Sequence, residues 1–493
     1  MYRRLIAPAA LVSALLLAAP AAAGGPAPGA PGIGDPYYPD YGNGGYDVAH
    51  YDLDLRYQPR TDLLQGTATI RARATQHLSR FDLDFGLKVS GVRVNGVPAS
   101  FTATGEQELQ ITPATAIPEG APMTVRVRYA DKPSEVRIHG FTSWVHTADG
   151  AVAANEPESA AWWFPSNDHP RDKATFAVSV QVPEGTQAIS NGTLTSTTTR
   201  DGWTRYAWRS ARPQATYLAT LAIGEFDVST GTADGRPVIN AYSRGLPAET
   251  GEAARASLER TGEIVRFLEG YFGRYPFEAV GGYVPNVTSS FALETQTRPF
   301  YSPKYFAKGP NTSVVVHELA HQWYGDSVSV HGWRDIWLNE GFATYAEWLW
   351  AQQQGEGTPQ QFADQVYAAH PADDPFWTVA PGDPGPEHQF DDAVYDRGAM
   401  ALQALRNTIG DRAFFALLKD WPRRHAHGNA TVNQFVAYAE QVTGRQLADF
   451  FDTWLFRPAK PSAPAARSAR VAAGPVTHPG TPHRPAGGHH ATR

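Results

Sequence analysis

The stretch Val314-Val315-Val316-His317-Glu318-Leu319-Ala320-His321 is followed, after seventeen intervening residues, by Asn339-Glu340-Gly341-Phe342-Ala343. Residues four apart lie on the same face of a helix, so His317 and His321 can direct their imidazoles at one metal ion from successive turns. Two histidine nitrogens and one carboxylate oxygen, from Glu340 on a second helix, leave the fourth tetrahedral position of a zinc ion open for water. An open position is typical of a catalytic zinc site, and the stretch predicts one.

Glu318 follows the first histidine and lies beside the metal without being a ligand. A general base must be within hydrogen-bond reach of the water that it deprotonates, and this position in the motif supplies such a carboxylate. A bare His-Glu-x-x-His motif also arises by chance on surface helices. The apolar residues before it and the acidic residue on a second apolar helix favour the zinc interpretation. We therefore predict one Zn²⁺ per chain and Glu318 as the catalytic base.

Around these residues the sequence resembles the zinc aminopeptidases related to aminopeptidase N, a family of gluzincin metallopeptidases. The resemblance runs through His317–Asp326 and Trp333–Ala343. In that family the Glu of a Gly-Ala-Met-Glu-Asn-like loop binds the free α-amine of the substrate. Phe291-Ala292-Leu293-Glu294-Thr295 stands at the matching place, with Phe instead of Gly and Thr instead of Asn. The resemblance implies that Glu294 binds the substrate amine.

A second acid that binds the amine in the family precedes a Phe-Pro-Cys-x-Asp-Glu-Pro-like stretch. Here Glu156-Pro157 precedes Phe164-Pro165-Ser166-Asn167-Asp168-His169-Pro170, which implies the same role for Glu156. Ala161 stands where the family has an arginine. An ordinary exposed loop glutamate is the alternative at this position.

Tyr395-Asp396-Arg397-Gly398-Ala399 is similar to the family's Tyr-Glu-Lys-Gly-Ala segment, whose tyrosine stabilises the tetrahedral oxyanion. The resemblance therefore implies a catalytic role for Tyr395. Its phenol can donate one hydrogen bond to the oxygen on which charge develops. Glu347 lies seven residues after Glu340, nearly two helical turns, so it can accept the N–H of a zinc-bound histidine; the alternative is an exposed or structural glutamate.

The resemblance implies an α+β multidomain protein, in which an N-terminal antiparallel β domain is followed by a mostly helical, thermolysin-like catalytic domain. The residue pattern agrees. Tyr51, Leu53 and Leu55 alternate with polar residues, and Asn95-Gly96 is typical of a hairpin turn. Helical spacing begins at about residue 252. The predicted divisions are a signal peptide (1–23), a flexible segment (24–45), the β domain (46–230), the catalytic domain (237–458) and a disordered tail (459–493).

Ser229 to Gly235 separates the two predicted domains and has the composition of a linker. Thr431 and Gln434 form a predicted capping box before a later helix.

Residues 1–23 have the pattern of a secretory signal peptide, with Arg3-Arg4 before an apolar run and Ala21-Ala22-Ala23 at the end. No later run reaches the roughly 18 apolar residues that a membrane span needs, so we expect a secreted mature chain without a membrane anchor. The chain has no Cys, which excludes disulfides. The tail is rich in Pro, Ala, Gly, His and Arg and has no acidic residue, a composition typical of disorder.

The predicted substrates are peptides with a free N-terminus, and we expect a monomer. The net charge of −7 argues against nucleic acid as a partner. Three alternative functions are compatible with the zinc motif: a metallo-endopeptidase, an epoxide hydrolase of the same fold, and a non-catalytic binding scaffold. Glu294 and Glu156 argue against an endopeptidase, because carboxylates that hold an α-amine are useful to an exopeptidase.

Overall fold

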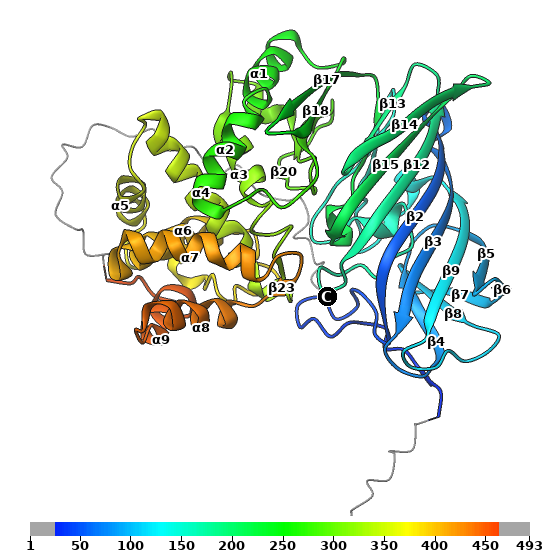
Figure 1. The fold of residues 1–493 in the computed structure, drawn as a ribbon, viewed down its shortest axis with the longest axis horizontal. Helices are drawn as coiled ribbons and strands as arrows, with labels where there is room; N and C mark the ends of the chain where they lie inside the picture. The colour runs from blue at the N-terminus through cyan, green and yellow to red at the C-terminus, as the bar shows by residue number, and fades with distance from the viewer. Residues whose placement is uncertain (1–24, 463–493) are drawn as a thin grey trace, which may run out of the picture.

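The computed structural model describes residues 25–462. A β-rich half and a mostly helical half lie side by side, as the sequence predicts (Figure 1). The predicted signal peptide and the tail from residue 463 onward lie outside the described residues. Within residues 25–462, the helices are too short or too polar to cross a membrane.

The β-rich half is built around an eight-stranded sheet in the order β14-β15-β12-β2-β3-β9-β5-β6. Its neighbours pair antiparallel except for β12 and β2, which run parallel. Along β2 buried and exposed side chains largely alternate, which is the period-two pattern of a sheet with one face on a core. The strands are β2 (Tyr46–Gln58), β3 (Leu63–Ala74), β5 (Val89–Val94), β6 (Val97–Pro98), β9 (Pro122–Asp131), β12 (Ala174–Pro183), β14 (Thr193–Arg200) and β15 (Trp203–Gln214).

The predicted hairpin at Asn95-Gly96 is confirmed. It joins β5 to β6, and both turn residues have positive φ, 50° and 81°. Asn and Gly tolerate that conformation, which is why this pair is a strong turn signal.

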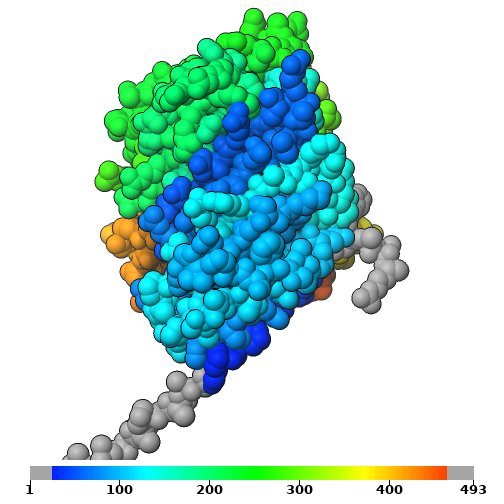
Figure 2. Space-filling view, turned by 90° about the vertical axis from the view of Figure 1, so that its right-hand side faces the viewer, coloured from blue at the N-terminus to red at the C-terminus, as the bar shows by residue number. Residues whose placement is uncertain are grey.

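Two four-stranded sheets complete this half, in the orders β1-β4-β8-β7 and β10-β11-β16-β13. Their strands are β1 (Ala27–Pro28), β4 (Leu78–Asp84), β7 (Ser100–Thr104), β8 (Glu108–Thr112), β10 (Trp144–His146), β11 (Ala151–Ala153), β13 (Gln187–Ser190) and β16 (Leu221–Gly224). The β-rich half forms most of the face seen in Figure 2, where its strands run in colour from blue through cyan to green.

The helical half begins with a five-stranded sheet in the order β17-β18-β19-β21-β20. Its strands are β17 (Phe226–Ala233), β18 (Arg236–Ser243), β19 (Val280–Val284), β20 (Ala292–Leu293) and β21 (Phe300–Tyr301), and a separate pair is β22 (Ser329–Val330) with β23 (Asn429–Ala430). The helices are α1 (Ala248–Leu258), α2 (Thr261–Phe272), α3 (Thr312–Ala320), α4 (Trp337–Gln354), α5 (Pro359–Ala369), α6 (Gly398–Ile409), α7 (Asp411–Arg424), α8 (Val432–Thr443) and α9 (Ala448–Phe451).

The capping box predicted before α8 is present. The Thr431 hydroxyl accepts the backbone N–H of Gln434, and the Gln434 side chain accepts the backbone N–H of Thr431.

The stretch from Ser229 to Gly235 is not an interdomain linker. It forms most of β17 and the turn into β18, and Asp234 and Gly235 both have positive φ. Asp-Gly is a hairpin signal, and Val228, Thr230 and Thr232 supply β-branched strand residues. The polar composition of this stretch reflects the exposure of β17, where most side chains face solvent.

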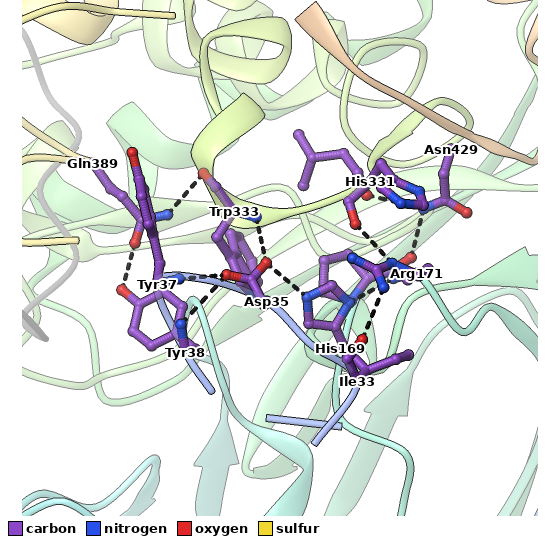
Figure 3. A network of polar contacts seen from close by, with 12 residues as sticks. Ile33, Asp35, Tyr37, Tyr38, His169, Arg171, His331, Trp333, Gln389 and Asn429 are labelled. Carbon is purple, nitrogen blue, oxygen red and sulfur yellow. Dashed lines mark hydrogen bonds and ion pairs between the residues drawn. The ribbon is translucent and has the colours of Figure 1, made fainter. Parts of the chain in front are cut away.

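The N-terminal segment, which we expected to be flexible, is packed where the structure describes it. Asp35 is buried and joins both halves: its Oδ2 lies 3.0 Å from His169 Nε2 and accepts the backbone N–H of Trp333 at 2.8 Å (Figure 3). Tyr38 is buried in the helical core and donates to Gln389. Composition predicted flexibility because these contacts are long-range and leave no local periodicity.

Candidate active site

The first two predicted zinc ligands come from a short, capped helix. The Asn311 side chain accepts the backbone N–H of Ser313 at 3.1 Å and so fixes the start of α3. His317 lies in its last turn, and His321 follows its end with helical dihedral angles. The two imidazole rings therefore lie on one face, with centroids 4.7 Å apart.

The third predicted ligand approaches from α4. Oε2 of Glu340 lies 3.2 Å from Nε2 of His317 and 3.4 Å from Nε2 of His321. All three side chains are buried, and their donor atoms lie within 4.8 Å of one another. The structure thus brings the predicted ligand set together.

The outer nitrogens of both imidazoles are held by acceptors. His317 Nδ1 lies 2.7 Å from Glu347 Oε1, and His321 Nδ1 lies 3.0 Å from the carbonyl oxygen of Tyr324. Each Nδ1–H can donate outward, which leaves the Nε2 lone pair directed at the shared point. This is the tautomer that a zinc ligand needs, so the donor set fits Zn²⁺. The contact between Glu347 and a predicted zinc-binding histidine, one of the two roles considered for Glu347 from the sequence, is present.

Burial and neighbouring charges set the protonation of this cluster. Burial opposes ionisation of Glu340, but the charge of His321 and the hydrogen bonds with both histidines lower its pKa to about 2. A carboxylate that stays ionised is what metal coordination requires. Burial raises the pKa of Glu318 to about 8, against the lowering effect of the two histidines.

Glu294 lies beside this cluster. Its carboxylate, Glu318 and His321 have donor atoms within 4.8 Å of one another. Tyr217 Oη donates to Glu294 Oε1 at 3.0 Å, and Gln322 Nε2 donates to the Glu294 carbonyl at 3.0 Å. Glu294 is therefore held from both its backbone and its side chain.

Glu156 is buried with the same group, with 2% of its surface exposed, so it is not an ordinary exposed loop glutamate. Within the described residues its Oε1 has no hydrogen-bond partner. Burial raises its pKa well above the usual value, and the charge of Glu294 is the next largest cause. A buried carboxylate oxygen with no donor, beside a second carboxylate, can accept a hydrogen bond from a cation.

The two departures from the family loop are accommodated by local contacts. Phe291 packs against Phe300, with ring centroids 5.3 Å apart. Thr295 Oγ1 donates to the carbonyl of Arg298 at 2.6 Å. On β20, Ala292 packs in the helical core and Leu293 in the β core, so Glu294 emerges where the two cores meet. The substitutions therefore leave the carboxylate at the predicted place.

Tyr395 lies in one turn of π-helix, Ala393–Arg397, and its ring is 6.0 Å from that of His317. Burial raises the pKa of the Tyr395 phenol well above its usual value, so it keeps its proton. Arg397 anchors this turn through hydrogen bonds to the carbonyls of Trp377 at 2.8 Å and Trp454 at 2.9 Å. The phenol is held close to the predicted metal site as a hydrogen-bond donor.

Sequence reasoning missed Tyr217 and Gln322, which position Glu294. Tyr217 is 77 residues before its partner, and no local pattern distinguishes it from a core tyrosine. Gln322 directly follows the second histidine of the motif, which is a signal that could have found it.

Comparisons with known proteins agree with this geometry. Residues 257–454 match the Peptidase family M1 domain, and residues 48–218 match the Peptidase M1 N-terminal domain. A glutamyl aminopeptidase from Bos taurus is 25% identical over 82% of this chain and 46% of its own length. An aminopeptidase M1 from Arabidopsis thaliana is 28% identical over 62% of this chain and 36% of its own length. The chain spans about half the length, or less, of these curated relatives.

Solved structures match over a larger share of their length. The M1 zinc metallopeptidase from Deinococcus radiodurans is 31% identical over 89% of this chain and 100% of its own, with a TM-score of 0.78. A mutant of that enzyme bound to a Tyr-Ser-Ala substrate matches with a TM-score of 0.75 over 86% of this chain and 97% of its own. Both domains of the fold are shared with this structure.

Proposed function

The chain belongs to peptidase family M1, a family of zinc metallopeptidases, and from this premise we propose that it is a secreted aminopeptidase. It removes residues one at a time from the free N-terminus of peptides. The observation that carries the proposal is the pair Glu294 and Glu156, two buried carboxylates beside the zinc ligands. Carboxylates in that position bind an ammonium group and are of no use to an enzyme that cleaves inside a chain.

The ammonium group determines which bond is cleaved. Glu294 and Glu156 hold it by charge-assisted hydrogen bonds, so the first peptide bond lies beside Glu318 and the ligand set. Internal peptide bonds have no such anchor. The substrate class proposed is therefore peptides whose α-amine is free and charged.

Each remaining group has one chemical task. When bound by His317, His321 and Glu340, one Zn²⁺ supplies a Lewis acid that lowers the pKa of water and polarises the carbonyl. Glu318 accepts the proton of the attacking water and delivers it to the departing amine. The Tyr395 phenol donates a hydrogen bond to the oxygen on which negative charge develops.

Secretion rests on the sequence of residues 1–23, which has the basic, apolar and small-residue regions of a signal peptide. N-terminal sequencing of the protein recovered from culture medium tests it, with an N-terminus near residue 24 as the expected result. Elemental analysis after dialysis tests the proposed count of one zinc per chain.

One peptide in free and N-acetylated forms tests the exopeptidase assignment. Acetylation removes the positive charge, so we expect stepwise N-terminal trimming of the free form and little cleavage of the acetylated form by mass spectrometry. Glu294→Gln should weaken trimming while zinc content stays the same. Glu252→Gln is the matched control, because it removes the same charge from an exposed position. Internal cleavage of the acetylated peptide at a comparable rate would make the enzyme an endopeptidase.

A further inference from the structure

Away from the proposed active site, a cavity of about 570 Å³ lies where the end of β15 meets the helical half. Its walls come from β18, the segment from Phe272 to Glu278, the segment after α3, and the C-terminal part of α7 with the loop that follows it. It contains none of the proposed zinc ligands, neither amine-binding carboxylate, and neither Glu318 nor Tyr395. Its volume falls in the range of small-molecule sites.

The cavity is basic although the whole chain carries a net charge of −7. Glu278 is the one acidic residue among its lining residues, and its Oε1 accepts the backbone N–H of Ala211 at 2.7 Å. The basic lining residues are Arg212, Arg236, Arg274, Lys419 and Arg423. A concave surface with one sign of charge concentrates ions of the opposite sign.

Several of these cations have no protein partner. Among residues 25–462, the side chains of Arg212, Arg274 and Lys419 make no hydrogen bond or ion pair. Arg236 pairs with Glu269, yet its Nη1 is buried and has no acceptor. A buried guanidinium nitrogen without an acceptor is costly, so it indicates a place for an anion.

His427 supplies a neutral polar group to the same wall. Burial and the nearby charges of Lys173 and Arg212 lower its pKa to about 4. Its Nδ1 is buried and has no partner among the described residues. A neutral imidazole can donate one hydrogen bond to an oxygen of an anion.

We propose that this cavity binds a small molecule that carries a phosphate group. Arginine forks match the oxygens of phosphate, and the lining contains four arginines and one lysine but a single carboxylate, that of Glu278. Phe272, Tyr275 and Trp323 are buried residues of the lining and offer an aromatic surface to an apolar part of the ligand. The occupant would contact both halves of the protein, so its binding should raise the melting temperature.

Calorimetric titration of the zinc-loaded protein with inorganic phosphate, at low and constant ionic strength, tests the proposal. We expect saturable binding that the double variant Arg212→Ala/Arg274→Ala weakens at least tenfold. These side chains are exposed and unpaired, so the variant should fold and keep its peptidase activity. Phosphate bound at the zinc ion instead would be unaffected by the two substitutions.

The double variant Arg126→Ala/Arg128→Ala is the matched control, because it removes two exposed arginines from β9, and none of the cavity's lining residues lies on that strand. It should bind phosphate like the wild type. Succinate should bind the wild type more weakly than phosphate does. The proposal is overturned if the wild type shows no saturable binding, if the Arg212/Arg274 variant binds as well as the wild type, or if succinate binds as tightly as phosphate.

Discussion

The predicted zinc site and the predicted amine site lie next to each other, but the chain builds them in different ways. Of the predicted zinc ligands, His317 lies on α3, His321 directly follows that helix, and Glu340 lies on α4, 23 residues after His317. Glu156 lies in the β-rich half and Glu294 in the helical half. The metal site is thus encoded within one domain, whereas the amine site exists only where two domains are docked.

The contacts around Glu294 show how that docking is maintained. Tyr217, at the end of the N-terminal domain, donates to the Glu294 carboxylate at 3.0 Å. Leu293, the residue before Glu294, packs in the core of the β-rich half. Substitutions at the catalytic residues of α3 and α4 should therefore reduce turnover of every substrate. Substitutions at the domain junction should weaken binding of the substrate amine.

The largest effect is expected for Glu318→Gln. The variant keeps the shape of the side chain but cannot accept a proton, so turnover should fall by about 10²- to 10⁴-fold. Initial rates with a fluorogenic aminoacyl substrate measure turnover. Elemental analysis should find the same zinc content per chain as in the wild type. Near-normal turnover would show that the catalytic base is another residue.

Tyr395→Phe should reduce turnover by about 10²- to 10³-fold, as loss of one oxyanion donor does in other hydrolases. The loss should appear in kcat more than in KM, because the hydrogen bond forms in the transition state. The phenyl ring keeps the packing against His317, so zinc content is the control. Wild-type kcat in the variant would remove Tyr395 from the proposed mechanism.

Glu347→Gln should weaken zinc binding by about 10- to 100-fold, as the loss of a histidine's hydrogen-bond partner does elsewhere. The substitution leaves a weaker acceptor 2.7 Å from His317 Nδ1 and removes its negative charge. Competition with a chelator measures the affinity. At saturating zinc, kcat should return close to the wild-type value. Such a result would show that Glu347 contributes to zinc affinity rather than to the catalytic step.

The sequence predicted what is local. Spacing placed His317, Glu318 and His321 on one helix, and the seven-residue interval placed Glu347 on the face of Glu340. Alternation predicted β2, and turn chemistry predicted the Asn95-Gly96 hairpin. These features depend on neighbours within a few residues, so the pattern contains the information.

What the sequence could not predict is long-range. The 77-residue contact of Tyr217 with Glu294 and the packing of Asp35 against His169 and Trp333 have no periodic signal. The stretch that was predicted as a linker is a hairpin because exposed strands and linkers have similar composition. Glu294 and Glu156 could be named only through the family resemblance, since they come from different domains and no local pattern marks either of them.

Glu156→Gln is expected to have the smallest effect, and it is the sharpest test of whether the predicted zinc site and the predicted amine site are separate. The amide keeps one oxygen as an acceptor but removes the charge, and Glu294 still holds the ammonium group. We expect kcat/KM for a free N-terminus to fall by about tenfold, the value of part of one charge-assisted hydrogen bond. The effect should lie mainly in KM, and zinc content should not change.

Glu158→Gln is the matched control two residues away, because Glu158 is equally buried but bonds to Tyr41 and His139 rather than facing Glu294. If Glu156→Gln lowers zinc content or leaves KM unaltered, the two sites are not the separate units that their construction indicates.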